Sequence, residues 1–193
     1  MNLQKMYAAQ QALRHHINYN EQDRFEKLIL ALLVEIGECA NEWRGFKFWS
    51  KDREPRTKIT CMACHGIGEV YQPIDGYQMT CPHCDGQGVE NSNNPLLEEY
   101  VDGLHFVLEL GIEKGWTPAV NDLTFQSGNV TKQFLALYEH ISIFKRNANK
   151  DNYYNLLSIY AGLGEMLGFT RDQIEQAYYS KNQINHERQA NGY

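Results

Sequence analysis

The chain has 193 residues and a formal net charge of −6, with 42% hydrophobic and 22% charged residues. This composition is ordinary for a globular protein, and the acidic balance argues against general binding to DNA or RNA, which needs a basic surface. No apolar run approaches the roughly 20 residues of a membrane span, and the first residues lack the layout of a signal peptide, so we expect a cytosolic protein with reduced cysteines.

Most of the chain is predicted to be helical. Six segments carry apolar residues three and four apart, the spacing of one helix face; in chain order they are residues 3–19, 24 to about 46, 96–115, 130–146, 151–168 and 170–189, with a loop expected at 115–129. Asp23 and Thr170 stand where N-caps are expected. Pro95 precedes the third segment, which should end near Gly111 or Gly115. The short connections predict an all-α fold, a helical bundle.

Residues 51–94 interrupt this helical pattern. They contain four of the five cysteines and three of the five prolines, with little helical periodicity. We therefore expect a helical domain formed by residues 1–50 and 95–193, with residues 51–94 inserted between two of its core helices.

The insertion carries a repeated cysteine motif. The pattern C-x-x-C-x-G-x-G occurs as CMACHGIG at 61–68 and as CPHCDGQG at 81–88, offset by 20 residues. Two C-x-x-C pairs at this separation predict a closed, structural zinc site with four thiolate ligands, namely Cys61, Cys64, Cys81 and Cys84. His65 and His83 are alternative ligands beside them. Over this short module the chain resembles the zinc repeats of DnaJ-type chaperones, a likeness from which we infer no chaperone function.

Two pairs of carboxylates predict a second kind of metal site. Glu35 and Glu38 are three residues apart on one predicted helix, and Glu99 and Asp102 repeat that spacing on the next. Residues three apart share a helix face, so two antiparallel helices can bring all four carboxylates to one point. Such oxygen ligands suit Mg²⁺ or Mn²⁺ and, through the ion, phosphate groups. The alternative interpretation is a solvated helix face.

With these motifs, the chain resembles the all-α dimeric dUTPases, within the MazG-like superfamily of NTP pyrophosphohydrolases. The segments that carry the resemblance are AAQQALRHHI, LLVEIGECANEWRGFKFWS, LLEEYVDGLHFVLELGI and YYSKNQINHERQANGY. The similarity spans nearly the whole chain except the zinc insertion. It implies Mg²⁺-dependent hydrolysis of dUTP, with dUDP as a second candidate substrate, to dUMP and pyrophosphate.

The resemblance also implies roles for individual residues. Glu35, Glu38, Glu99 and Asp102 would hold Mg²⁺, and Glu35 or Glu38 would be the catalytic base. The substrate-binding residues would be Gln10 (or its neighbour Gln11) at the uracil, Trp49 along the nucleoside, Lys47 near the phosphates, His105 at the deoxyribose, and Lys181, Asn182, Asn185 and Arg188 at the phosphates.

Two alternatives remain open at this point. The first is a related pyrophosphohydrolase that acts on another nucleotide such as dCTP. The second is a non-catalytic regulatory or binding protein that works through its zinc module. The resemblance further implies a homodimer from a bacterium or a phage-infected cell. A protein partner at the zinc module is an additional expectation, and nucleic acid is not an expected partner.

Overall fold

The computed structural model describes residues 1–71, 76–90, 94–118 and 124–192. These residues form α1 (Leu3–Ile17), α2 (Arg24–Trp43), β1 (Ile59–Thr60), β2 (Glu69–Tyr71), β3 (Gln78–Thr80), β4 (Val89–Glu90), α3 (Pro95–Lys114), α4 (Val130–Arg146), α5 (Lys150–Met166) and α6 (Arg171–Ala190). The predicted all-α fold with a small insertion between two core helices is confirmed. Part of the loop expected at 115–129 lies outside the described residues.

The helix ends follow from local backbone chemistry. The helix α6 begins with a capping box, in which the Thr170 side chain and the Gln173 side chain each accept from the other residue's backbone amide. Asp23 occupies the N-cap position of α2 but makes no capping hydrogen bond, and its carboxylate pairs with Lys27 instead. The helix α2 ends at Trp43, earlier than predicted, because Arg44 adopts a left-handed conformation with φ of 62°.

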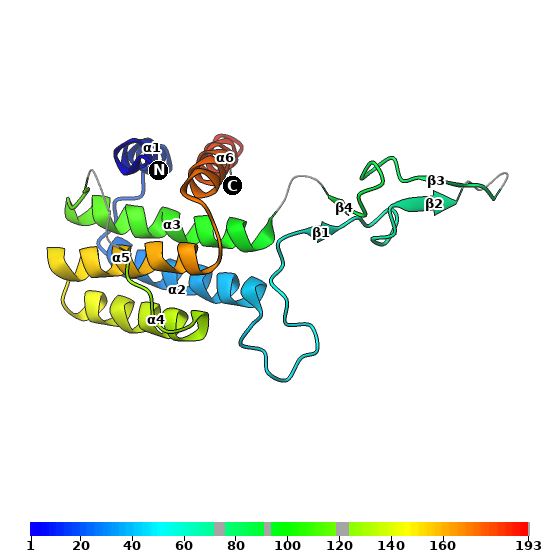
Figure 1. Ribbon diagram of the computed structural model, residues 1–193. Helices are drawn as coiled ribbons and strands as arrows, with labels where there is room; N and C mark the ends of the chain where they lie inside the picture. The colour runs from blue at the N-terminus through cyan, green and yellow to red at the C-terminus, as the bar shows by residue number, and fades with distance from the viewer. Residues whose placement is uncertain (72–75, 91–93, 119–123, 193) are drawn as a thin grey trace.

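Four helices lie alongside one another and two cross them. Figure 1 shows α2, α3, α4 and α5 side by side, with α1 and α6 seen nearly end-on across α3. The core between them is made of buried aliphatic and aromatic side chains, among them Leu32, Ile36, Val107, Leu108, Leu137, Ile141, Phe144 and Leu156. The extensive contact between α2 and α3 places the two predicted carboxylate pairs next to each other.

A glycine in α3 makes room for a tyrosine side chain of α5. A Cβ atom built on Gly103 would lie 2.3 Å from the Tyr160 hydroxyl oxygen, and Tyr160 donates a 2.5 Å hydrogen bond to the Tyr100 carbonyl oxygen. Any larger residue at position 103 would have to displace the buried Tyr160 side chain and disturb its hydrogen bond to Tyr100.

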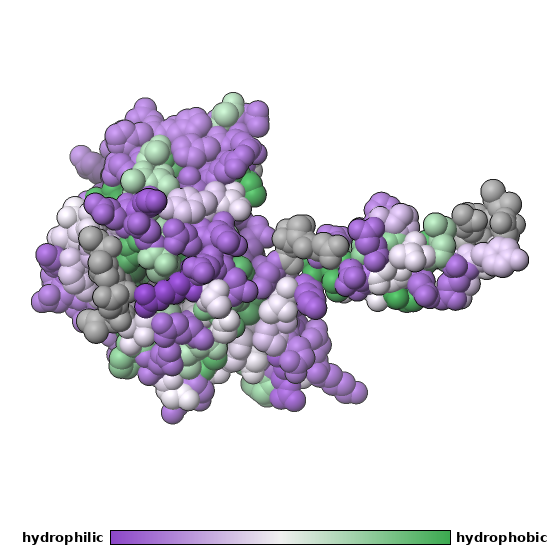
Figure 2. Space-filling model, turned by 45° about the horizontal axis from the view of Figure 1, so that its top comes forward, coloured by the Kyte–Doolittle hydropathy of each residue, from purple (hydrophilic) through white to green (hydrophobic). Residues whose placement is uncertain are grey.

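The insertion forms an arm that projects from the helical body (Figures 1 and 2). The strands pair antiparallel as β1 with β4 and β2 with β3, with Thr60 opposite Val89 and Val70 opposite Met79. The buried centre of the arm consists of the four predicted zinc cysteines, with Val70 packed against them. None of the described helices combines the length and the apolar character needed to cross a membrane.

Candidate active site

Three carboxylates from two helices meet at one point. Glu35 and Glu38 lie one turn apart on α2, and Glu99 lies on α3. One carboxylate oxygen of each lies within 4.8 Å of the others. The fourth predicted ligand, Asp102, is not part of this group. Its Oδ2 atom lies 2.6 Å from the Lys181 ammonium nitrogen of α6.

The electrostatics of this cluster favour binding of a cation. Burial, together with repulsion from Asp102 and Glu38, raises the pKa of Glu35 to about 7. Burial, together with repulsion from Asp102, Glu38 and Glu35, raises the pKa of Glu99 to about 7. These shifts mean that the carboxylates resist sharing one site as anions. A divalent cation relieves that repulsion, and oxygen donors are the ligands that Mg²⁺ and Mn²⁺ prefer, so the residues fit such an ion.

Lys181 supplies fixed positive charge beside the cluster. Its ammonium nitrogen lies 2.8 Å from Glu98 Oε1 as well as 2.6 Å from Asp102 Oδ2. Burial opposes the charged form, but these two hydrogen bonds outweigh it and raise the pKa of Lys181 above its usual value. Burial raises the pKa of Asp102, while Lys181 and, more weakly, Arg188 lower it. The helix α6 is therefore anchored to α3 at this end of the site.

A pocket of about 490 Å³ opens next to the cluster. Its lining residues come from α1, α2, the segment between them, α3 and α6; they are Gln10, Leu13, Ile17, Tyr19, Arg24, Lys27, Leu28, Ala31, Glu35, Asp102, His105, Phe106, Glu109, Lys181, Asn185, Arg188 and Gln189. Seven of these were predicted from the sequence, namely Gln10, Glu35, Asp102, His105, Lys181, Asn185 and Arg188. Glu35 is the one member of the three-carboxylate cluster that also lines the pocket.

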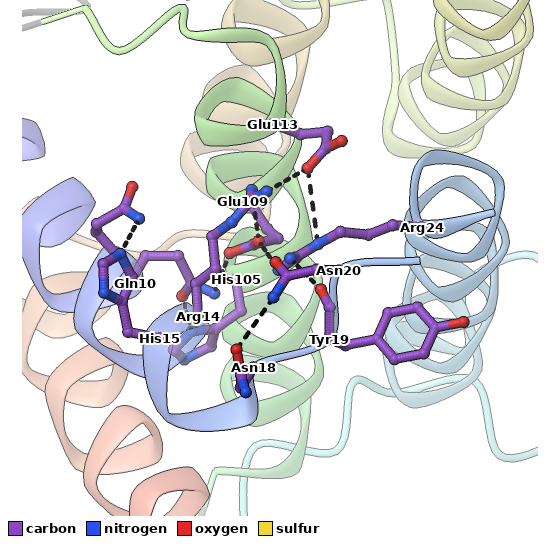
Figure 3. Close-up of polar contacts among 11 residues, drawn as sticks. Gln10, Arg14, His15, Asn18, Tyr19, Asn20, Arg24, His105, Glu109 and Glu113 are labelled. Atoms are coloured by element: carbon purple, nitrogen blue, oxygen red, sulfur yellow. Dashed lines mark hydrogen bonds and ion pairs between the residues drawn. The ribbon is translucent and has the colours of Figure 1, made fainter. Parts of the chain in front are cut away.

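Arg24 and Glu109, which line this pocket, belong to an ion-pair network with Arg14 and Glu113 (Figure 3). Arg24 of α2 and Arg14 of α1 both pair with Glu109 Oε1 of α3, at 2.7 and 3.1 Å. Arg14 also pairs with Glu113 at 2.5 Å. Sequence analysis missed all four residues. A signal was present for Glu109, because it is a charged residue in an otherwise apolar helix segment and a buried charge needs a partner.

Three predicted substrate residues do not line the pocket. Trp49 is 65% exposed and makes edge contacts with Phe46 and Phe48 on the segment after α2, and Lys47 lies beside it over the Phe46 ring. Asn182 is buried, and its side-chain nitrogen has no hydrogen-bond partner among the described residues. The roles of these three residues stay predictions.

The geometry of the cysteine cluster fits zinc. Sγ atoms are 3.9 Å apart between Cys61 and Cys81 and 3.7 Å apart between Cys64 and Cys84. A tetrahedral zinc with bonds of about 2.3 Å requires sulfur atoms about 3.8 Å apart, far longer than a disulfide bond. The amides of two glycines, Gly68 and Gly88, donate to Cys64 and Cys84 at 3.2 Å. Such donors stabilise thiolate ligands.

The repeated glycines let the two halves of the module interlock. A Cβ atom on Gly68 would lie 2.4 Å from the Gly86 carbonyl oxygen, and one on Gly88 would lie 2.4 Å from the Gly66 carbonyl oxygen. Both Gly68 and Gly88 also have positive φ angles, which glycine adopts without strain. The second glycine of each copy therefore permits close approach to the other copy, and the four cysteines are held together from both sides.

One comparison with known proteins identifies the chain. A family model described as dUTPase matches residues 2–61 and 86–193. The matched ranges contain all six described helices and leave out most of the arm, including three of the four clustered cysteines. No curated protein matches the chain. Since the match covers most of the chain, the protein belongs to the dUTPase family, to which a four-cysteine module has been added.

Proposed function

We propose that this protein is a Mg²⁺-dependent dUTP diphosphatase that hydrolyses dUTP, with dUDP as a second candidate, to dUMP and pyrophosphate. Membership of the dUTPase family implies a nucleotide substrate. The observation that carries the proposal is the position of Glu35, which belongs both to the carboxylate cluster and to the pocket. A nucleotide lying in the pocket would have its phosphates beside that cluster.

Glu35, Glu38 and Glu99 would hold Mg²⁺ or Mn²⁺, and Asp102 would complete the ligand set. When bound, such an ion supplies positive charge to phosphate oxygens and makes a coordinated water more acidic. Glu35 faces the pocket and Glu38 is not among its lining residues. We therefore assign Glu35, rather than Glu38, to accept the proton of the attacking water.

The helix α6 would bind the phosphates. Lys181, Asn185 and Arg188 all line the pocket from this helix. Positioned cations and amide donors stabilise the charge that develops on phosphate oxygens during transfer. Lys181 reaches both Glu98 and Asp102, so its ammonium group is already held at the end of the pocket where the phosphates would lie.

We also propose that two chains associate as a homodimer. Leu30 and Val34 lie one turn apart on α2 and are 62% and 48% exposed, and Leu135 of α4 is 63% exposed. Helices α2 and α4 are neighbours in the bundle. Large apolar side chains left exposed on neighbouring helices favour burial against another surface.

The test is pyrophosphate release from each deoxynucleoside and ribonucleoside triphosphate, with and without Mg²⁺, comparing wild type with Glu35→Gln. We expect selective, Mg²⁺-dependent turnover of dUTP that falls by about 1,000-fold or more in the variant, the scale of losing an essential catalytic group. Glu26→Gln is the matched control, because Glu26 lies exposed on the same helix. Equal turnover of many nucleotides would support a general pyrophosphohydrolase, and no turnover would refute the catalytic proposal.

A further inference from the structure

Two histidines from different helices meet away from both predicted metal sites. Nδ1 of His16 in α1 lies 3.0 Å from Nδ1 of His186 in α6, across 170 positions of sequence. The ring centroids are 5.3 Å apart, and the ring planes make an angle of 25°. Neither histidine lines the pocket or belongs to the carboxylate and cysteine clusters. The proposed function therefore gives neither side chain a role.

The helices that carry these histidines run in the same direction. Near the start of both helices, the Asn2 backbone amide donates to the Glu175 carboxylate at 2.9 Å. His16 lies in the last turn of α1, and His186 lies four residues before the end of α6 at Ala190. Because contacts join both the starts and the ends, the carboxyl-terminal ends of α1 and α6 lie side by side.

The two helix ends favour a cation beside the imidazoles. The carbonyl groups at the carboxyl-terminal end of a helix carry partial negative charge, which stabilises a cation within the last turn. Arg14 belongs to the same turn as His16, but its guanidinium group is paired with Glu109 and Glu113. That arginine is therefore directed into α3, and its charge is compensated there.

The facing nitrogens have the separation that a single metal ion requires. Two neutral rings share one hydrogen bond here, with one Nδ1 as donor and the other as acceptor. If the donating ring instead carries its proton on Nε2, both Nδ1 lone pairs become available as ligands. Zinc–nitrogen bonds of about 2.0–2.1 Å at angles of about 90–110° place the two nitrogens about 2.9–3.4 Å apart. The observed 3.0 Å lies within this range.

We propose that His16 and His186 form a third metal site, which binds a divalent transition metal ion and clips α1 to α6. Imidazole ligands suit Zn²⁺ and Ni²⁺, whereas Mg²⁺ prefers oxygen, so this site and the carboxylate cluster select different ions. Water completes the coordination on the solvent side, where His16 is exposed. Ile17 and Asn185, the neighbours of the two histidines, line the pocket, so the ion joins two of its walls.

The first test counts bound ions. Ni²⁺ is titrated calorimetrically into the zinc-loaded, full-length protein, with excess Mg²⁺ to occupy the carboxylate cluster. The wild type should bind one Ni²⁺ per chain at a site that is lost in His16→Gln and in His186→Gln. The matched control, His15→Gln, removes the adjacent histidine, which contacts Gln11 instead, and should keep that site. No such binding by the wild type, or equal binding by His16→Gln, would overturn the proposal.

The second test identifies the coordinating atoms. Two-bond ¹H–¹⁵N correlation spectra of the zinc-loaded protein are recorded before and after addition of one further equivalent of Zn²⁺, which is diamagnetic. Both His16 and His186 should become protonated at Nε2, and both Nδ1 resonances should move. A response from only one of the two rings, or coordination through Nε2, would overturn the bridging geometry.

The third test measures the clip. An ion that joins two helices of the folded chain binds the native state in preference to the unfolded state, so the midpoint of thermal unfolding should rise with Ni²⁺ concentration. The midpoint should rise in the wild type and in His15→Gln, and stay unchanged in His16→Gln. A wild-type midpoint that does not respond to Ni²⁺ would contradict the clip. These three measurements need no nucleotide, so their outcome is independent of whether the protein hydrolyses dUTP.

Discussion

At the scale of single residues, Glu35 links stability to pH. Its pKa is raised from 4.5 to about 7 in the folded protein, so between these values the folded state binds more protons than the unfolded state. Stability therefore decreases as pH rises through this range. Burial is the largest cause of this shift, and the repulsion from Asp102 and Glu38 that adds to it is what makes the cluster suited to a divalent cation.

We expect Glu35→Gln to be more stable than the wild type at about pH 8, and the difference to shrink towards about pH 5, where Glu35 is protonated. The stability difference is measured by thermal unfolding at several pH values in Mg²⁺-free buffer. The buffer contains no chelator, because a chelator would also remove zinc. Glu26→Gln should show no such pH-dependent difference. A stability difference between Glu35→Gln and wild type that stays the same at every pH would contradict the assignment. Added Mg²⁺ should stabilise the wild type more than the variant.

At the scale of elements, the ion-pair network holds three helices together. Arg14 belongs to α1, Arg24 to α2, and Glu109 and Glu113 to α3. The Arg24 and Glu109 side chains are 9% and 5% exposed. Such a network fixes the relative positions of the helices, because removal of one arginine leaves the buried Glu109 carboxylate with less compensating charge.

Arg24→Met should therefore lower the free energy of unfolding by about 3 kcal/mol, the scale for breaking a buried ion pair. Denaturant unfolding monitored by circular dichroism gives this value. Lys27→Met is the control, because Lys27 lies on the same helix with an exposed side chain and should change stability little. A loss in Arg24→Met no greater than in the control would show that Arg14 alone is enough to hold Glu109.

At the scale of the whole molecule, the arm and the helical body have separate cores. The arm is centred on four cysteines and Val70, while the helices share one large apolar core. A module this small buries too little apolar surface to fold without its metal.

We expect one zinc per chain, and its removal by a thiol-compatible chelator should expose the amides of β1 to β4 to hydrogen exchange while the helices stay protected. Exchange followed by mass spectrometry, together with zinc analysis, measures both. Cys61→Ser should reproduce the effect, and Cys39→Ser, at a buried position in α2 outside the zinc cluster, should retain its zinc. Loss of helix protection together with the arm would show that the two cores are coupled.

Much of this molecule could be predicted from local sequence. The 3.6-residue spacing of apolar side chains predicts the helices, since each must bury one face. The repeated C-x-x-C motif predicts the cysteine cluster, because each pair is brought together by its own short turn. The spacing of Glu35 and Glu38 places both on one side of α2 for the same local reason.

Other features depend on contacts between distant residues. Gln10 meets Glu109 across 99 positions of sequence, and Lys181 meets Asp102 across the interface of α6 with α3. Sequence spacing describes the face of one helix and does not say which side chain of another helix lies opposite. The sequence by itself therefore determined the helices, the two sets of candidate metal ligands and the family. Only the packing of α1, α2 and α6 on α3 decided that Asp102 pairs with Lys181, that Arg24 and Arg14 hold Glu109, and that His16 meets His186.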